Sequence, residues 1–363
     1  MKKFLLIILL FISYNQIGFS QSNQEIYEQA FQDINCMLNK TCSASFKDAV
    51  FTVENAYFSD MLDFKTIENE IHLLKVLTVE VMKSRELIYE STDKDNVKKY
   101  ASLFAVMTDT IPVLLDSNKI FIHNPFQYDF YDVFGQDDWS NMFVSKLLVT
   151  KKGNCHSLPY LYKILADEIN ANAHIAVAPN HFYIKHQNKI NGWYNTELTS
   201  GIFPNDAWLM ASGYIHLDAV VNKLYMEALS EKQMLALNLI DLAKGYEKKL
   251  GIHAKSEFIL KCCDTVLKYY PNYINALILK AETKKKEFDF LMEKHNAQNP
   301  ADIFIYPEAQ QIFDEMTALY AQIHELGYRK MPEEMYLNWL VSLKEERSKY
   351  ENKKITNFKS KSN

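Results

Sequence analysis

One cysteine stands where the chain can turn a thiol into a nucleophile. Cys155 follows the turn residues Gly153 and Asn154 and precedes an amphipathic segment. Free N–H groups and the dipole at the start of a helix stabilise a thiolate and an oxyanion. Pro159 fits the first turn of such a helix, since no helical hydrogen bond is lost there. By position alone, Cys155 is either a catalytic thiol or a buried structural cysteine.

His181 is the candidate base for this thiol, because it opens a β-like run shortly after the helix. An imidazole within hydrogen-bond reach of a thiol takes its proton and later returns it to a leaving group. Three other histidines are rivals. His156 is next to Cys155 in the chain, but neighbouring side chains on a helix diverge. His174 and His186 lack any supporting context.

A third residue is expected to orient the imidazole. Trp193, Asn195 and Glu197 alternate along a β-like run and therefore share one face of the strand. Asn195 or Glu197 could accept a hydrogen bond from the ring of His181. A carboxylate would also stabilise the imidazolium, whereas an amide would mainly hold its orientation. Both residues stay candidates on the sequence alone.

The elements that must position these side chains are one helix and a small sheet. Apolar residues from Leu158 to Ile169 recur at helical spacing, and residues 188–192 suit a hairpin loop. The three β-like runs are His174–Ala178, His181–His186 and Trp193–Leu198. The sequence predicts an α+β fold that is mostly helical. A small antiparallel sheet is expected to pack on the cysteine-bearing helix, with helical regions on both sides.

The pattern Gly153-Asn154-Cys155, then His181, then Trp193-Tyr194-Asn195-Thr196-Glu197 resembles the transglutaminase-like superfamily, in particular its bacterial cysteine-peptidase branch. In those domains a Gly-x-Cys turn starts a helix, a histidine opens the next-but-one strand, and a Trp-x-x-x-Asp strand supplies an acid. Glu197 takes the place of that aspartate. The resemblance implies a nucleophilic Cys155, a basic His181 and no metal or organic cofactor.

The expected activity is acyl transfer from an amide of a protein or peptide through a thioester. Water as acceptor makes the protein a peptidase or amidase, and an amine makes it a crosslinking enzyme. The alternative is an inactive scaffold that binds a protein partner through its C-terminal helices. Those helices resemble a tetratricopeptide-type hairpin, because one ends in Tyr270-Pro271-Asn272 and the next carries the small Ala281 on its packing face.

The start of the chain resembles a signal peptide. Lys2 and Lys3 precede a short apolar run, and small residues at Gly18 and Ser20 predict cleavage before Gln21. We therefore expect an exported protein, periplasmic or secreted, because the run is too short for a stable membrane anchor. The predicted regions are 1–20 signal peptide, 21–130 N-terminal helices, 131–215 transglutaminase-like core, 216–350 helical repeat-like region and 351–363 polar tail.

The flanking regions show packing patterns only. Helices are expected over about Phe64–Glu90 and Asp95–Leu115, and toward the C-terminus over Glu308–Glu325 and Glu333–Tyr350. The formal net charge of −5 and the lack of a long basic run argue against a nucleic-acid partner.

Cysteine usage points to a mixture of roles. The chain has five cysteines, and export permits disulfides. Cys36 and Cys42 are near enough in sequence to pair, whereas the neighbours Cys262 and Cys263 are expected to be buried apolar fillers. Because five is odd, at least one thiol is free or pairs with another molecule. Cys155 is the candidate for that free thiol.

Overall fold

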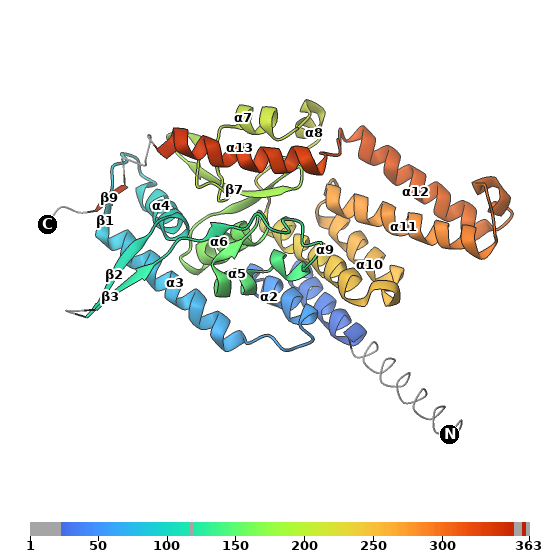
Figure 1. The fold of residues 1–363 in the computed structure, drawn as a ribbon, viewed down its shortest axis with the longest axis horizontal. Helices are drawn as coiled ribbons and strands as arrows, with labels where there is room; N and C mark the ends of the chain where they lie inside the picture. The colour runs from blue at the N-terminus through green and yellow to red at the C-terminus, as the bar shows by residue number, and fades with distance from the viewer. Residues whose placement is uncertain (1–22, 117–118, 352–357, 361–363) are drawn as a thin grey trace, which may run out of the picture. The chain divides into compact units, whose positions relative to one another are not determined.

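The computed structural model describes residues 23–116, 119–351 and 358–360 (Figure 1). Helices form most of these residues, and the strands build small sheets of two or three strands. The predicted mostly helical α+β class is therefore confirmed. Among the described residues, no helix combines the length and apolarity that crossing a bilayer requires. The predicted signal peptide at 1–20 lies outside them.

The chain forms two compact units. The first joins the described part of Met1–Leu62 to Leu235–Glu325, and the second joins Asp63–Met234 to Leu326–Asn363. The predicted core region 131–215 lies wholly in the second unit. The helices of the first unit span residues 23–39, α2 (Phe46–Tyr57), α9 (Glu231–Leu250, which begins in the second unit), η2 (Gly251–His253), α10 (Ser256–Tyr269), α11 (Ile274–Lys294), η3 (Pro300–Ile303) and α12 (Pro307–Glu325).

Helices α10 and α11 of the first unit form the predicted hairpin. Helix α10 ends just before Tyr270-Pro271, and the rings of Tyr270 and Tyr273 stack with centroids 5.1 Å apart in the connecting turn. Cys262 and Cys263 are fully buried, as expected of apolar fillers. The hairpin is present, and its kinship with tetratricopeptide repeats stays a prediction.

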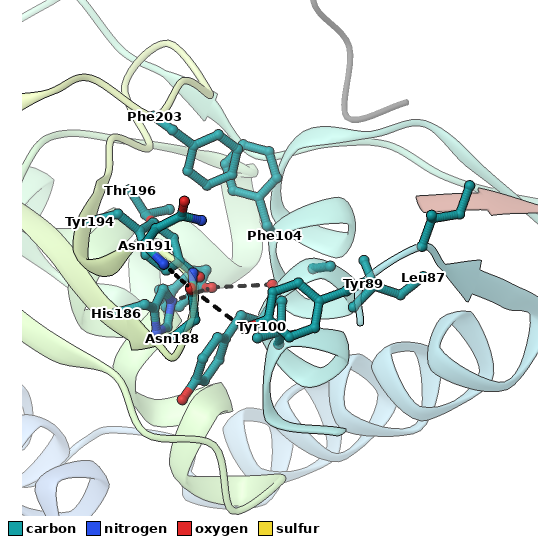
Figure 2. Close-up of a pocket in the computed structure, with 14 residues that line it drawn as sticks. Leu87, Tyr89, Tyr100, Phe104, His186, Asn188, Asn191, Tyr194, Thr196 and Phe203 are labelled. Atoms are coloured by element: carbon teal, nitrogen blue, oxygen red, sulfur yellow. Dashed lines mark hydrogen bonds between the residues drawn. The ribbon is translucent and has the colours of Figure 1, made fainter. Parts of the chain in front are cut away.

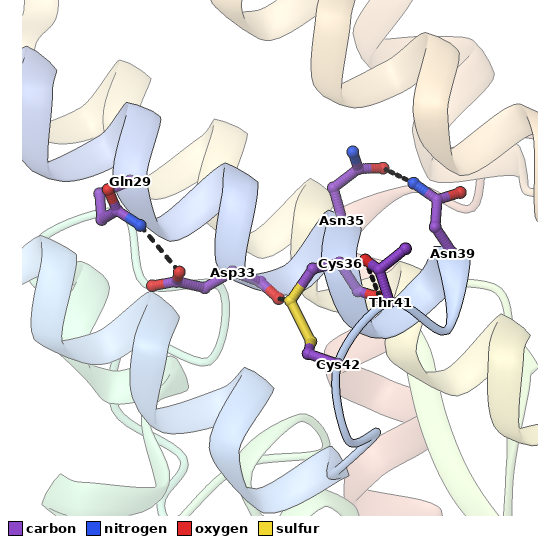
Figure 3. The surroundings of a disulfide bond; sticks show 7 residues. All are labelled: Gln29, Asp33, Asn35, Cys36, Asn39, Thr41 and Cys42. Carbon is purple, nitrogen blue, oxygen red and sulfur yellow. Dashed lines mark hydrogen bonds between the residues drawn. A yellow bond between two sulfur atoms is a disulfide. The ribbon is translucent and has the colours of Figure 1, made fainter.

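A disulfide closes the end of the first helix (Figure 3). Cys36 lies in the last turns of the helix over residues 23–39, and its sulfur is bonded to Cys42 just beyond it. The N–H of Thr41 donates to the carbonyl of Cys36 at 3.0 Å, so the chain turns back on the helix end. The pairing predicted from the spacing is confirmed.

The second unit contains every described strand and the remaining helices. Its elements are α3 (Phe64–Ser84), β1 (Arg85–Leu87), α4 (Lys94–Thr108), β2 (Ile111–Asp116), β3 (Lys119–His123), β4 (Gln127–Tyr128), η1 (Trp139–Met142), α5 (Val144–Thr150), β5 (Lys152–Gly153), α6 (Ser157–Glu168), β6 (His174–Ala178), β7 (His181–Asn188), β8 (Gly192–Thr196), α7 (Asp206–Ser212), α8 (Leu217–Val221), α13 (Glu333–Glu351) and β9 (Phe358–Ser360).

The antiparallel sheet β6–β7–β8 supports the candidate site, and the three predicted strands are confirmed within two residues at each end. Strands β6 and β7 are joined by the two residues Pro179 and Asn180. A proline followed by a residue with positive φ (56° at Asn180) is typical of a type II turn. Helix α6 packs on the sheet through the stacked rings of Tyr160 and Phe182.

Two helices of the N-terminal region are shorter than predicted. Helix α3 ends at Ser84 rather than near Glu90, because Arg85–Leu87 instead pairs with β9 from the C-terminal tail. Helix α4 ends at Thr108 rather than near Leu115, and the β2–β3 hairpin follows. Pro112 explains the second error, since proline does not continue a helix. The region 21–130 is therefore not purely helical, and the polar tail contributes a strand.

Candidate active site

The turn before helix α6 holds Cys155 in place. Strand β5 pairs in parallel with β4, so that Tyr128 lies opposite Gly153. A side chain at Gly153 would meet the Ser157 hydroxyl at 2.5 Å and Leu147 at 2.8 Å, which explains the glycine. The close packing at Gly153 therefore fixes the position of the backbone at Cys155, two residues later.

Asn154 acts as the cap of the helix that Cys155 begins. Its side-chain oxygen accepts hydrogen bonds from the N–H groups of His156 (3.0 Å) and Ser157 (3.1 Å). Its carbonyl accepts from the N–H of Leu158, so the helical hydrogen bonds start one turn before Ser157. Among the described residues, no group accepts from the N–H of Cys155. That N–H is therefore available to a developing oxyanion beside the sulfur.

The structure brings the predicted thiol, imidazole and carboxylate together. His181 Nε2 lies 2.6 Å from Glu197 Oε2, and both side chains are fully buried. The Tyr336 hydroxyl lies between the other side of the ring and the thiol, 3.4 Å from His181 Nδ1 and 3.0 Å from the Cys155 sulfur, which also faces the Asn180 carbonyl at 3.5 Å. Asn195 does not reach the imidazole, because its amide donates to the Pro204 carbonyl (3.0 Å) and to Asp206 (2.7 Å). Of the two candidates for the third member, the structure places only Glu197 on His181.

The three groups favour a thiolate beside an imidazolium. Burial would raise the pKa of the Cys155 thiol, but the hydrogen bond and charge of His181 outweigh it and hold that pKa below its usual value. Burial would likewise lower the pKa of His181, but the charge of Glu197 and the bond to Cys155 raise it to about 10. The pKa of Glu197 is lowered, because its ion pair with His181 outweighs its burial. The thiol therefore loses its proton more readily than an ordinary buried cysteine.

Helix α13 contributes side chains that the sequence gave no reason to place here. The hydroxyl of Tyr336 donates to the Cys155 sulfur at 3.0 Å and lies 3.4 Å from His181 Nδ1. Trp339 presents its ring to the imidazole of His181 at 4.7 Å and 90°. In Figure 1, α13 crosses over β7, consistent with these contacts. Neither residue belongs to a motif, so no sequence signal identifies them.

Tyr128 is a second neighbour of the sulfur outside the predicted set of cysteine, histidine and carboxylate. It comes from β4, the strand that pairs with the cysteine turn, and its hydroxyl is buried. Burial and the charge of the thiolate raise the pKa values of Tyr128 and Tyr336 well above their usual range, so both stay protonated. Both phenols are therefore potential hydrogen-bond donors at the site. The pairing of β4 with the Gly153 turn is a tertiary feature that no local pattern predicts.

The rival histidines have other structural partners. His156 Nδ1 faces the Met142 carbonyl at 2.9 Å, and His174 Nδ1 faces the Leu229 carbonyl at the same distance. His186 bridges the Tyr162 hydroxyl and the Asn172 carbonyl, both at 2.9 Å. Among the described residues, no three His, Cys, Asp or Glu side chains gather as metal ligands would.

The site is covered in this conformation. Cys155 is 6 % exposed, His181 is 3 % exposed, and Tyr336 is fully buried over the sulfur. A substrate carbonyl cannot reach the thiolate unless Tyr336 moves away. The arrangement can therefore perform nucleophilic attack on an amide only after α13, or at least its first two turns, shifts from the site.

Comparison with known proteins finds no matching family, no similar curated protein and no similar solved structure.

Proposed function

We propose that the protein is an exported cysteine-dependent acyl-transfer enzyme of transglutaminase-like type that hydrolyses amides of proteins or peptides. The single observation that supports this most is the buried ion pair of His181 and Glu197 at 2.6 Å beside the buried thiol of Cys155. A cysteine paired with a histidine that is in turn held by a carboxylate is the arrangement that thiol-dependent acyl transfer needs. Burial of a charge pair is costly unless the pair has a function or excellent partners.

The reaction proceeds in two halves. The Cys155 sulfur attacks the amide carbonyl, and the resulting oxyanion accepts hydrogen bonds from the Cys155 N–H. The C–N bond then breaks as His181 gives its proton to the leaving amine, which leaves a thioester on the sulfur. Water attacks the thioester while His181 accepts a proton, and the acid and the thiolate are released. An amine in place of water would give crosslinking by the same steps.

In the covered conformation the enzyme is latent. The Tyr336 hydroxyl occupies the position next to the sulfur that a substrate carbonyl needs. Movement of α13 exposes the thiolate without changing the contact of His181 with Glu197. We therefore expect low activity from the full chain and higher activity from variants that loosen α13.

The test is to trap the thioester on Cys155. Wild-type protein and the variants Trp339→Ala, Cys155→Ala and His181→Asn are incubated with a pool of synthetic peptide amides. The reactions are quenched in acid, and the tryptic peptide Gly153–Lys163 is analysed by mass spectrometry. An acyl adduct is expected in wild type and, at higher level, in Trp339→Ala. No adduct in any protein, or an undiminished adduct in His181→Asn, would contradict the proposal.

A second candidate function is that of a scaffold with the catalytic geometry kept only as structure. The observation that favours it is the burial of Cys155 beneath Tyr336. Under this hypothesis the C-terminal helices bind a protein partner, and Cys155→Ala retains every interaction of the wild type. Capture of a binding partner by wild type and by Cys155→Ala distinguishes the enzyme from the scaffold. A variant that loses the biological role of the wild type would reject the scaffold hypothesis.

A further inference from the structure

A pocket lies beside strand β8 (Figure 2). Its volume is about 300 Å³, and Thr196 is one of the residues that line it. Successive strand residues point to opposite faces, so Thr196 faces this pocket while Glu197 contacts His181. The pocket is therefore separate from the thiol site, although one strand borders both.

Five rings form an aromatic collar around the pocket. Tyr100 stacks on His186 at 4.0 Å, and His186 contacts Tyr194 at 5.7 Å. Tyr194 contacts Phe203 at 6.1 Å, and Phe203 packs on Phe104 at 4.6 Å. Tyr100 and Phe104 are four residues apart on α4, which closes the collar. Such a surface offers ring edges and faces to a flat apolar occupant.

Polar groups lie on one side of this collar. Asn188 and Asn191 come from the hairpin that joins β7 and β8, and Figure 2 shows both beside the rings. The Thr196 hydroxyl is buried and, among the described residues, has no hydrogen-bond partner. An unpaired buried hydroxyl is unfavourable, and a ligand with a polar group would offset that cost.

The pocket carries no net charge. None of the residues that line it is Asp, Glu, Lys or Arg. Burial lowers the pKa of His186 to about 3, so its ring is neutral, with Nδ1–H donating to the Asn172 carbonyl. Its other nitrogen, Nε2, then accepts from the Tyr162 hydroxyl. A charged occupant would lose hydration here, and no lining side chain carries an opposite charge; the nearby carboxylate of Asp93 is engaged by the Tyr89 hydroxyl at 3.0 Å.

We propose that this pocket binds a small, uncharged molecule with one aromatic ring and one hydrogen-bonding group. The volume is at the small end of ligand pockets and suits a ligand of one or two rings. The ring lies within the aromatic collar, and the polar group faces Asn188 and Thr196. The proposal does not depend on catalysis at Cys155.

The first experiment measures binding of defined probes to the full-length protein by calorimetry and saturation-transfer NMR. The neutral probes are p-cresol and indole, and the charged probes are benzoate and benzylamine at pH 7. We expect saturable binding of the neutral probes and at least about tenfold weaker binding of the charged ones. Equal affinity for all four, or no saturable binding of p-cresol and indole, would overturn the proposal.

Variants locate the binding. Phe203→Ala removes a partly exposed ring of the collar, and Phe121→Ala removes an exposed ring elsewhere in the same unit as a control. Loss of the collar ring should weaken p-cresol binding by about tenfold, and the control should bind like wild type. Ala101→Phe, which fills the pocket from α4, should abolish binding while the melting temperature shows that the variant is folded. Unchanged binding in both collar and filling variants would refute the assignment.

The role of the Thr196 hydroxyl is tested by comparing the binding of p-cresol and toluene. Thr196→Val keeps the shape of the side chain and removes the hydroxyl, so it should abolish any preference for p-cresol over toluene. Cys155→Ala should bind p-cresol like wild type, which separates failure of this proposal from failure of the enzymatic one. A preference for p-cresol that survives in Thr196→Val would contradict the predicted orientation of the ligand.

Discussion

At the residue scale, the ionisation of Cys155 depends on a carboxylate that does not touch it. Glu197 stabilises the protonated ring of His181, and that ring stabilises the thiolate. Tyr336 adds a hydrogen bond to the sulfur, and its hydroxyl also lies 3.4 Å from His181 Nδ1. Each group by itself would be neutral in a buried site, and the three together favour charges.

Replacing Glu197 by Gln should weaken both the thiolate and catalysis. Loss of the carboxylate removes the charge that raises the pKa of His181, so that pKa falls and the pKa of Cys155 rises. The pH at which iodoacetamide labelling of Cys155 is half-maximal should therefore increase, measured in the Trp339→Ala background where the thiol is accessible. Thioester formation should fall by about 10²–10⁴. An unchanged labelling profile would show that Glu197 only packs against the ring.

The thiolate–imidazolium pair should stabilise the fold in a defined pH window. His181, with its pKa raised to about 10, contributes stability that is complete below the unfolded value of about 6.5 and is lost as pH rises toward 10. Cys155, with its pKa lowered, contributes stability that is complete above about 8.5 and is lost as pH falls. Their sum therefore decreases above about pH 8.5, where the Cys155 contribution is complete and that of His181 is still being lost.

That window is measured by urea unfolding of wild type and the double variant Cys155→Ala/His181→Gln across pH 5–10. The difference between the two free energies of unfolding should be larger near neutral pH than at pH 10. A difference that rises steadily toward pH 10 would mean that the pair is not charged in the folded protein.

At the element scale, the site is an assembly of three short segments under one helix. The turn that Asn154 holds before α6 supplies the sulfur, the β6–β7 turn aims His181, and the residue after β8 supplies the carboxylate. Helix α13 covers them and is held by the indole N–H of Trp339, which donates to Ser212 of α7 at 3.0 Å. Helix α13 is therefore attached to α7 of the same unit.

Loosening α13 should expose the thiol. Trp339→Ala removes the contacts with His181 and Ser212, and iodoacetamide should then label Cys155 at least about tenfold faster than in wild type. Val341→Ala, an exposed residue on the same helix, should leave the rate unchanged. Equal labelling rates in Trp339→Ala and wild type would show that α13 does not control access.

Tyr336→Phe removes the hydroxyl with little change in side-chain volume. It should raise the pKa of Cys155, because the hydrogen bond from Tyr336 lowers that pKa.

At the scale of the whole molecule, each of the two units has its own core and its own cysteines. The first unit holds the disulfide and the inert pair Cys262 and Cys263, whose pKa values burial raises. The second holds Cys155, whose pKa is lowered. Among the described cysteines, reactivity is therefore expected in the second unit only.

The disulfide should contribute to the stability of the first unit. Closing the short loop from Cys36 to Cys42 restricts the unfolded chain, which is worth about 2 kcal/mol by loop entropy. The variant Cys36→Ser/Cys42→Ser should lose about this much free energy of unfolding in urea, while iodoacetamide labelling of Cys155 stays unchanged. A stability equal to that of wild type would mean that the native helix end does not need the bond.

The sequence by itself determined the order of thiol, imidazole and carboxylate and the strands that carry them. Turn residues, helical spacing and strand alternation are local, and they lie within a few residues of Cys155 and His181. Local sequence does not determine whether Asn195 or Glu197 contacts His181. The register pairs Asn195 with Lys185, four residues from His181, so only Glu197 comes within reach.

Only the tertiary structure decided what surrounds the sulfur. Tyr336 is 181 residues from Cys155 in the chain, and β9 shortens α3 by pairing with β1 from the other end of the sequence. Contacts between distant segments leave no periodic pattern in either segment. The aromatic collar has the same origin, because its rings come from α4, β7, β8 and the loop after β8. Packing of separate elements, rather than local spacing, therefore determines both the access to the thiol and the pocket beside β8.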